Sequence, residues 1–219
     1  MPSPSASVVI LAGGQSKRLG GRDKALLQVE QMCLLQRVLG AASGLSDDVL
    51  VVVNVPDKYR LDAHVRQVVD AIAAKGPLGG LYTGLSHMRH ERCLLLGCDS
   101  PFLHERLLRW LMEQRGDFDA VVPRLLHQQD PSEGARSAPS FRYFPLHAVY
   151  RRRCLPIVKQ LLDQDRLAMR GLLDRVSVHY VEQEALAKLD PTLNTFININ
   201  TPTDFELAKQ RWMANKSGL

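Results

Sequence analysis

The residues with the clearest chemical potential lie in one short stretch, residues 13–24, which contains four glycines and four cations. A glycine has no Cβ, so a glycine-rich backbone bends sharply and approaches a ligand closely. Successive backbone N–H groups in such a bend form a nest that binds anions. The stretch follows the apolar run 8–11, which predicts a buried strand. A strand that leads into a basic, glycine-rich loop is typical of proteins that bind a polyphosphate.

The loop matches neither of two common phosphate-binding motifs. No G-x-x-x-x-G-K-[ST] sequence is present, and Gly13-Gly14 is not followed by the G-x-x-G of the dinucleotide fingerprint. A surface turn with solvated lysines is the alternative interpretation. The coincidence of strand, glycines and cations favours phosphate binding.

Polar residues also follow three later apolar runs. Asn54, Asp70 and Asp99 each come directly after such a run. Ligands of open α/β sheets bind outside the carboxyl ends of the strands, so we expect these side chains and the loop at one edge. Mg²⁺ binds one or two carboxylates together with phosphate oxygens of the substrate, and Asp99 is the predicted metal ligand. A helix N-cap before the following proline is the alternative for Asp99.

The elements that must position these residues alternate along the chain. Helical spacing predicts helices near 32–43, 107–112, 153–164, 166–175 and 202–214, and one through 85–88 that follows a glycine-rich turn at 76–81. We expect strands at 7–12, 49–53, 65–69, 93–98, 120–122, 146–150, 176–181 and 196–200. The alternation predicts an α/β fold, a three-layer, doubly wound and mostly parallel sheet, with a small antiparallel piece late in the chain.

The domain organisation follows from the same pattern. We expect one domain over residues 1–219, with a flexible tail at 1–6 and a mobile polar loop at 126–143. The last helix has a clear predicted start, with Thr201 as N-cap, Pro202 at the first helical position and Asp204 at the third.

Composition places the chain among ordinary globular proteins, with 45% hydrophobic and 23% charged residues and a net charge of +5. The mild positive charge suits an acidic small-molecule substrate, and no basic run indicates nucleic acid. The four cysteines form no metal-binding spacing, and we interpret them as free thiols in a reducing cytoplasm. Neither a signal peptide nor a membrane span is expected, and we expect a monomer.

Residues 11–24 resemble the signature L-A-G-G-x-S-x-R-[ML]-G-x-x-K of nucleoside-triphosphate transferases, and most closely that of the molybdenum cofactor guanylyltransferases, the MobA family. The double glycine is associated with guanine, whereas cytidine-using relatives more often have L-A-A-G. Four later segments are also similar to motifs of this family. They are residues 70–80 (D-x(n)-G-P-L-[AG]-G), 98–101 (C-D-[ST]-P), 145–156 (P-L-x-A-V-Y…L-P) and 196–202 (F-x-N-[IV]-N-T-P).

The resemblance implies a Rossmann-like nucleotidyltransferase fold and a Mg²⁺-dependent enzyme. Such an enzyme joins GMP from GTP to the terminal phosphate of Mo-molybdopterin and releases pyrophosphate. It implies catalytic roles for Lys24, Asp99 and Arg18, with Asp99 holding the metal. The implied substrate-binding residues are Leu11, Ala12, Gly13, Gly14, Lys24, Asn54, Asp70, Gly79, Gly80, Asn198 and Asn200. Molybdenum-insertion proteins and apo-molybdoenzymes or their chaperones are the implied protein partners.

Within that site, Asn54 and Asp70 are expected on the nucleotide side, and Gly79 and Gly80 beside the base or ribose. Asn198 and Asn200 are expected on the acceptor side. The structural alternatives are a strand-end cap for Asp70, a plain turn for the glycines and a solvated face for the two asparagines.

Two further features have both structural and functional interpretations. The run 151–153, three arginines, could meet the acceptor's phosphate, although such a run is usually only solvated. His147 is expected to be a packed histidine rather than a base.

Alternative functions stay open from the sequence. One is the same chemistry with other substrates, either CTP with the pterin or a nucleoside triphosphate with a sugar phosphate. The other is a carrier that binds nucleotide or molybdopterin without catalysis.

Overall fold

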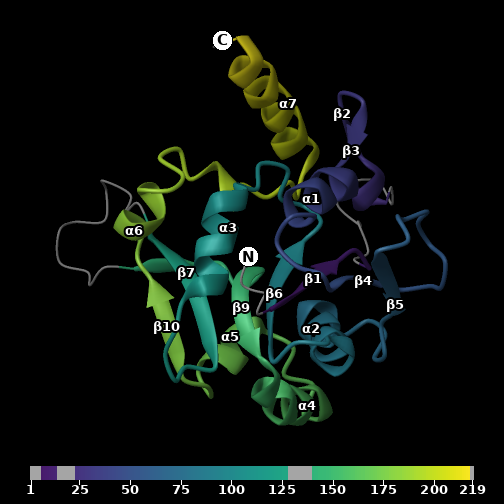
Figure 1. The fold of residues 1–219 in the computed structure, drawn as a ribbon, viewed down its shortest axis with the longest axis vertical. Coiled ribbons are helices and arrows are strands. Elements are labelled where there is room, and N and C mark those ends of the chain that lie inside the picture. The colour runs from purple at the N-terminus through teal and green to yellow at the C-terminus, as the bar shows by residue number, and fades with distance from the viewer. Residues whose placement is uncertain (1–5, 14–22, 128–139, 218–219) are drawn as a thin grey trace.

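The computed structural model describes residues 6–13, 23–127 and 140–217, and within them one eight-stranded sheet dominates the fold (Figure 1). Its strand order is β10-β7-β9-β6-β1-β4-β5, and β8 pairs with β7 outside this path. The strands are β1 (Ser7–Leu11), β4 (Val49–Val53), β5 (Val65–Val69), β6 (Arg92–Gly97), β7 (Ala120–Leu126), β8 (Phe141–Tyr143), β9 (His147–Arg151) and β10 (Val178–Val181). A separate hairpin joins β2 (Gln28–Val29) to β3 (Met32–Cys33).

Helices cover both faces of the sheet. They are α1 (Leu34–Ala42), α2 (Gly76–His87), α3 (Glu105–Glu113), α4 (Leu155–Asp163), α5 (Met169–Leu173), α6 (Gln183–Ala187) and α7 (Pro202–Ser217), with short 3₁₀ turns η2 (Lys24–Leu26), η3 (Arg152–Cys154) and η4 (Asn194–Phe196). The helices α1, α3 and α6 pack on one face, and α2, α4 and α5 pack on the other. The predicted three-layer α/β architecture is confirmed.

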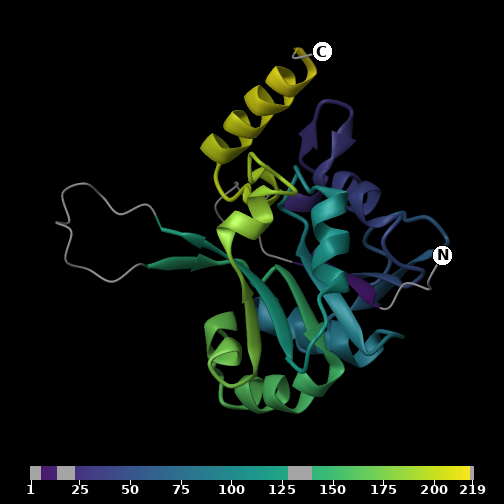
Figure 2. The same ribbon diagram turned by 60° about the vertical axis from the view of Figure 1, so that its left-hand side comes forward.

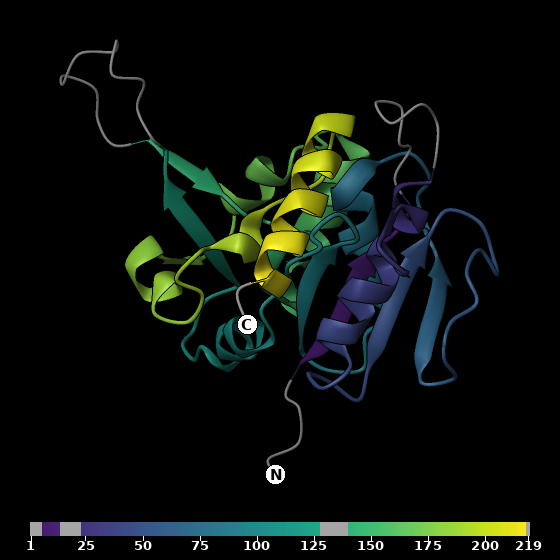
Figure 3. The same ribbon diagram turned by 90° about the horizontal axis from the view of Figure 1, so that it is seen from above.

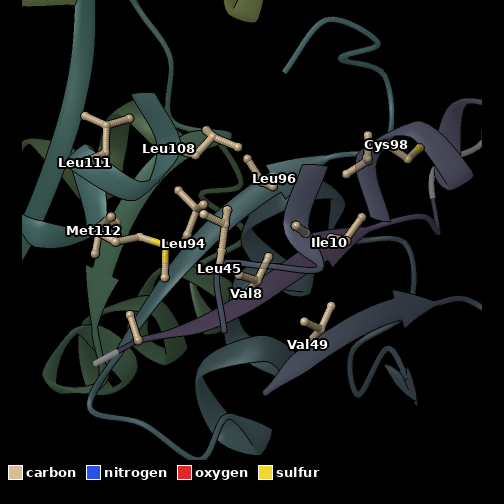
Figure 4. Close-up of a cluster of buried hydrophobic side chains, with 14 of the residues drawn as sticks. Val8, Ile10, Leu45, Val49, Leu94, Leu96, Cys98, Leu108, Leu111 and Met112 are labelled. Atoms are coloured by element: carbon tan, nitrogen blue, oxygen red, sulfur yellow. The ribbon is translucent and has the colours of Figure 1, made fainter. Parts of the chain in front are cut away.

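The alternation of side chains along β1 explains why both faces are covered. Val8 and Ile10 belong to the core under α1 and α3, whereas Val9 belongs to the core under α2 and α4. Figure 4 shows Val8 and Ile10 beside residues of β6 and α3 in the first of these cores. Strands buried on both faces are built from continuous apolar runs, as in residues 8–11 of β1, 49–53 of β4 and 93–96 of β6.

Strand direction places the ends of six strands at one edge. Parallel pairing joins β1 to β4 and β6, and β4 to β5, while β9 runs antiparallel to both β6 and β7. Because β10 is parallel to β7, the strands β1, β4, β5, β6, β7 and β10 all end at the same edge, which we call the carboxyl edge. The opposite edge is called the amino edge. The chain adds β4 and β5 on one side of β1 and β6 on the other, so a topological switch point lies between β1 and β6.

The glycine-rich segment at 76–81 differs from its prediction. It is the first turn and a half of α2, not a turn before the helix. Glycine is a poor helix former, but here tertiary packing decides, because two glycines let α2 approach β1 closely. A Cβ on Gly80 would lie 2.7 Å from Leu11 Cδ2, and one on Gly84 would lie 2.6 Å from Val9 Cγ1.

Other predicted boundaries also change. Residues 197–200 form no strand after η4, and the predicted helix 166–175 is reduced to the five residues of α5. The predicted loop 126–143 contains strand residues at both ends, where β7 and β8 pair, while residues 128–139 lie outside the described chain. Of the predicted tail at 1–6, Ala6 is described and is fully buried.

Two elements extend from the body. The β7–β8 pair projects sideways in Figure 2, and α7 extends upward, away from the sheet, in Figures 1 and 2. Figure 3, seen from above, shows α7 in front of the sheet. The predicted start of α7 is confirmed, since Asp204 N donates to Thr201 Oγ1 at 3.1 Å and Thr201 N donates to Asp204 Oδ2 at 2.8 Å. None of the described helices is long and apolar enough to cross a membrane.

Candidate active site

Lys24 and Asp99 meet at the switch point between β1 and β6. Lys24 Nζ lies 2.9 Å from Asp99 Oδ2 and donates at 2.9 Å to Asn200 Oδ1. Both side chains of the ion pair are only 16% exposed. Lys24 begins η2, Asp99 follows β6, and Asn200 precedes α7, so three distant segments supply this group. The structure thus brings together three residues that the sequence analysis singled out.

The second carboxylate oxygen of Asp99 is the unusual atom of the site. Oδ1 is buried and accepts no hydrogen bond from the described residues. It folds back over Gly97, where a Cβ would overlap it. A buried carboxylate oxygen without a donor is costly unless another partner takes its place.

These properties fit a magnesium ion. Mg²⁺ takes oxygen ligands and needs only one or two protein carboxylates when substrate phosphates supply the others. The described residues contain no cluster of three or more metal-ligating side chains, so the fit depends on Asp99 together with a bound triphosphate.

The segment before α7 lines the other side of Asp99. Ile199 N donates to the Asp99 carbonyl oxygen at 2.9 Å, and Ser100 Oγ donates to Asn198 Oδ1 at 3.0 Å. The Ile199 side chain is fully buried. Although the segment forms no strand, the amides of Asn198 and Asn200 both reach residues of the site.

Sequence reasoning missed a second group beside Lys24. Asp23 Oδ1 accepts from Ala25 N at 3.0 Å, which caps η2, while Asp23 Oδ2 lies 2.9 Å from Lys58 Nζ. Tyr59 Oη lies 2.9 Å from Asp23 Oδ2 and 3.0 Å from the Ala12 carbonyl oxygen. No motif marks Lys58 and Tyr59, because their position depends on the path of the β4–β5 connection.

The remaining predicted residues lie around the ends of β1, β4 and β5. Asn54 is exposed after β4, and its backbone packs under Gly13, where a Cβ would lie 3.3 Å from Asn54 N. Asp70 Oδ1 accepts from Thr83 Oγ1 at 2.7 Å and from Ile72 N at 3.3 Å, which supports the strand-end cap.

The predicted site residues Gly79 and Gly80, in the first turns of α2, pack against neighbouring atoms and do not face open space. Gly80 is buried against Leu11, and a Cβ on Gly79 would lie 3.1 Å from the Ile72 carbonyl oxygen. Their placement beside the base or ribose stays a prediction. Gly14 and Arg18 lie outside the described residues, and so do their predicted roles.

Two buried titratable groups near Asp99 are held neutral. Burial lowers the pKa of His147 to about 4, although the charge of Asp99 and a hydrogen bond to the Thr195 backbone act in the opposite direction. Burial, aided by Asp99, raises the pKa of Cys98 to about 12. A thiol with that pKa is a poor nucleophile at neutral pH. His147 also packs among Phe144 and Phe196, as expected of a packed histidine.

The arginine run 151–153 lies at the amino edge, because β9 is antiparallel to β6. Arg152 donates to the carbonyl oxygens of Leu85 and Met88 at the end of α2, and Arg153 pairs with Asp119. The suggestion that this run meets the acceptor's phosphate is therefore wrong. Its arginines hold helix ends and loops in place at the opposite side of the sheet.

A lysine, a carboxylate and two amides thus meet at the switch point of a mostly parallel α/β sheet, the position where such folds bind ligands. Residues 8–181 match the MobA-like NTP transferase domain family. The chain belongs to this family.

Curated relatives align over nearly the whole chain. The probable molybdenum cofactor guanylyltransferase of Pelotomaculum thermopropionicum is 35% identical, covering 97% of this chain and 95% of that protein. The molybdenum cofactor guanylyltransferase of Desulfosudis oleivorans is 32% identical, covering 92% and 93%. The chain is thus similar to nucleotidyltransferases over its full architecture, and it is itself a nucleotidyltransferase.

Solved structures show the same fold. Molybdopterin-guanine dinucleotide biosynthesis protein A from Archaeoglobus fulgidus superposes with a TM-score of 0.75 at 23% identity, covering 95% of this chain and 99% of that one. A CMP:2-keto-3-deoxy-manno-octonic acid synthetase complexed with CTP superposes with a TM-score of 0.70 at 17% identity, covering 96% and 99%.

Proposed function

We propose that this protein transfers GMP from GTP to the terminal phosphate of Mo-molybdopterin and releases pyrophosphate. The observation that carries the proposal is the ion pair of Lys24 and Asp99 at the switch point, with Asn200 on the same ammonium group. The names of the two relatives at 35% and 32% identity support guanine as the donor's base and the molybdenum cofactor as the acceptor.

The reaction is an in-line displacement at the α-phosphorus of GTP. A bond forms between an oxygen of the acceptor phosphate and the α-phosphorus, and the bond from that phosphorus to the oxygen bridging to the β-phosphorus breaks. The bridging oxygen leaves with its electron pair on pyrophosphate. No covalent enzyme intermediate is required, and catalysis consists of positioning and charge neutralisation.

In this mechanism the Lys24 ammonium group changes its anionic partner from Asp99 to the triphosphate of the donor. Without substrate its ammonium group is neutralised by Asp99 and held by the Asn200 amide. A triphosphate offers several anionic oxygens to the same ammonium group, so Lys24 binds the donor and orients the α-phosphate. The backbone amides of Gly13 and Gly14, and Arg18, would complete this binding in the proposed site.

Asp99 is the residue that would hold Mg²⁺ in this site, through the oxygen that accepts no hydrogen bond. The ion, when bound with the triphosphate, neutralises charge that develops on the α-phosphate and on the leaving pyrophosphate. Asn198, which accepts from Ser100, and Asn200, which accepts from Lys24, would supply their amide N–H groups as donors for the acceptor.

Pyrophosphate release tests the proposal. Each of the four nucleoside triphosphates is incubated with Mg²⁺ in the presence and absence of Mo-molybdopterin. We expect release only with GTP and only when the pterin is present. Release from CTP, or with a sugar phosphate as acceptor, would move the protein to a related activity on the same fold. Tight binding of pterin or nucleotide without any release would contradict catalysis and favour a carrier.

A cytoplasmic location and a monomeric state belong to the same proposal. The cysteines at 33, 93, 98 and 154 are free thiols, and all but Cys33 are buried. Delivery of the product to apo-molybdoenzymes or their chaperones would follow. Size-exclusion chromatography with light scattering tests the monomer directly.

A further inference from the structure

The side chains of Lys58 and Tyr59 connect the two segments that flank residues 14–22. Ala12 is the next-to-last described residue of the first segment, and Asp23 begins the second. Tyr59 Oη lies 3.0 Å from the Ala12 carbonyl oxygen and 2.9 Å from Asp23 Oδ2. Lys58 Nζ lies 2.9 Å from the same Asp23 oxygen and 3.4 Å from the Ala12 carbonyl oxygen.

The two acceptors in this group, the Ala12 carbonyl and the Asp23 carboxylate, need both Tyr59 and Lys58 as donors. The Ala12 carbonyl and the Asp23 carboxylate are both acceptors, and a tyrosine hydroxyl has one proton to donate. The Lys58 ammonium supplies three more donors, so each acceptor receives one. The Lys58 and Asp23 side chains are 17% and 23% exposed, so the ion pair is partly shielded from water.

Tyr59 is itself fixed from outside the site. Its backbone N–H donates to Gln67 Oε1 on β5 at 3.0 Å, and its ring packs against the core under α1. Burial and the neighbouring Asp23 charge raise the pKa of the Tyr59 hydroxyl, so it keeps its proton and stays a donor. Tyr59 is therefore held in a fixed position, and the β4–β5 connection places it beside the end of β1.

The path from Tyr59 to the ion pair of the site is short. Asp23 uses Oδ2 for Tyr59 and Lys58 and uses Oδ1 to cap η2 through Ala25 N at 3.0 Å. Lys24 is the first residue of η2, and its ammonium group reaches Asp99. Holding Asp23 thus fixes the backbone from which Lys24 extends.

We propose that Tyr59, with Lys58, is a positioning residue for Lys24. Its hydroxyl holds Asp23 and the Ala12 carbonyl so that the Lys24 ammonium stands ready for the triphosphate. This inference rests on the proposed function for its kinetic consequence, but its structural part concerns the protein without substrate. Tyr59 does not contact the reacting atoms in this assignment.

The first test is kinetic. Tyr59→Phe removes only the hydroxyl, and we expect KM for GTP to rise about fivefold, with kcat changed less than about twofold, as for loss of one hydrogen bond. In a Lys24→Met background, the same substitution should change KM by less than about twofold, because the residue it acts through is absent. Tyr82→Phe, which removes a hydroxyl from α2 outside these contacts, is the matched control and should leave KM unchanged.

The second test does not depend on activity. The side-chain ammonium signal of Lys24 is followed by NMR on ¹⁵N-lysine protein without nucleotide and is assigned with Lys24→Arg. We expect Tyr59→Phe to shift or broaden this signal, and Tyr82→Phe to leave it in place.

An unchanged Lys24 signal in Tyr59→Phe overturns the inference. So does an equal rise of KM in the wild-type and Lys24→Met backgrounds, since Tyr59 would then act by another route. If the wild-type protein releases no pyrophosphate from GTP, the proposed function fails by itself, and the Lys24 signal still decides the positioning role.

Discussion

Two aspartates at opposite edges of the sheet are buried in different ways. Asp48 lies at the amino edge, and its side chain is fully buried. It accepts hydrogen bonds from Ser7 Oγ at 2.5 Å, from Arg66 Nη2 at 2.5 Å and from Arg89 N at 2.8 Å. Asp99 lies at the carboxyl edge, where Oδ2 pairs with Lys24 and Oδ1 has no donor.

The difference separates a structural carboxylate from the carboxylate for which we propose a functional role. Burial alone would raise the pKa of Asp48, but the hydrogen bonds from Ser7, Arg89 and Arg66 outweigh it and hold the pKa below its ordinary value. Both carboxylate oxygens of Asp48 accept hydrogen bonds from the protein, so neither oxygen is available to bind a ligand. Asp99 keeps one oxygen unused, which favours binding over stability.

Asp99→Asn should have the largest effect at the carboxyl edge. We expect turnover in the pyrophosphate assay to fall by about 10³-fold, because the proposed metal carboxylate loses its charge. The melting temperature should fall modestly as well, because the substitution removes the charge that pairs with Lys24 Nζ at Oδ2, although Oδ1 itself loses no hydrogen bond. Near-normal turnover with Mg²⁺ present would contradict the proposed role of Asp99.

Asp48→Asn should reverse this pattern at the amino edge. Removing one charge leaves Arg66 with a neutral partner in a buried site, and we expect a loss of about 3 kcal/mol in the free energy of unfolding. Urea titration measures the loss. The specific activity of the folded fraction should stay at the wild-type value. A variant as stable as the wild type would show that the hydrogen bonds of Asp48 contribute little.

We also expect acid to lower the stability of the fold through His147, which lies at the carboxyl edge. Its pKa is about 4 in the folded protein, against 6.5 ordinarily. The unfolded chain therefore binds this proton first as the pH falls. The stability that the neutral ring contributes is complete above pH 6.5 and is lost progressively toward pH 4, by about 3 kcal/mol.

Urea unfolding of wild type and His147→Gln at pH 7 and pH 4.5 measures this contribution. We expect the variant to lose much less stability over that interval than the wild type does. Equal losses in the two proteins would show that His147 is not the group responsible.

Two glycine substitutions should have the smallest effects, one on turnover and the other on stability. In Gly97→Ala the new Cβ overlaps Asp99 Oδ1, and we expect the carboxylate to shift and turnover to fall about tenfold, while stability changes little. In Gly84→Ala the new Cβ lies 2.6 Å from Val9 Cγ1, inside the core between α2 and β1. We expect a loss of about 1–3 kcal/mol of stability there and unchanged turnover of the folded enzyme.

Turnover and urea unfolding are measured for both variants. Each serves as the control for the other, because both add one methyl group at a buried glycine. The comparison fails if Gly97→Ala is the less stable and Gly84→Ala the less active of the two.

Elements whose signal is local could be predicted from the sequence. The continuous apolar runs of β1, β4 and β6 indicated strands buried on both faces, which in turn required helices on both faces. The start of α7 was predicted through Thr201 and Asp204, because a capping box uses only residues within one turn. Polar residues at strand ends indicated the carboxyl edge, and Lys24 and Asp99 do meet there.

Elements whose conformation depends on distant partners could not be predicted in this way. The first turn of α2 is rich in glycine, and only its packing on Leu11 and Val9 makes a helix with those residues favourable. Residues 197–200 have a strand-like pattern but lack a neighbouring strand, since Ile199 N bonds the Asp99 carbonyl instead. The β7–β8 pairing at the ends of the predicted loop depends likewise on residues far apart in sequence.

The sequence by itself determined the layered α/β fold and the edge at which Lys24 and Asp99 meet, because each follows from residue type and local order. Tertiary structure alone decided that Asp99 keeps one oxygen without a donor, and that Tyr59 and Lys58 hold Asp23 beside Lys24. These properties depend on how the β4–β5 connection and the segment before α7 fold over the end of β1. No spacing along the chain encodes that approach, since it results from packing between elements up to 176 residues apart.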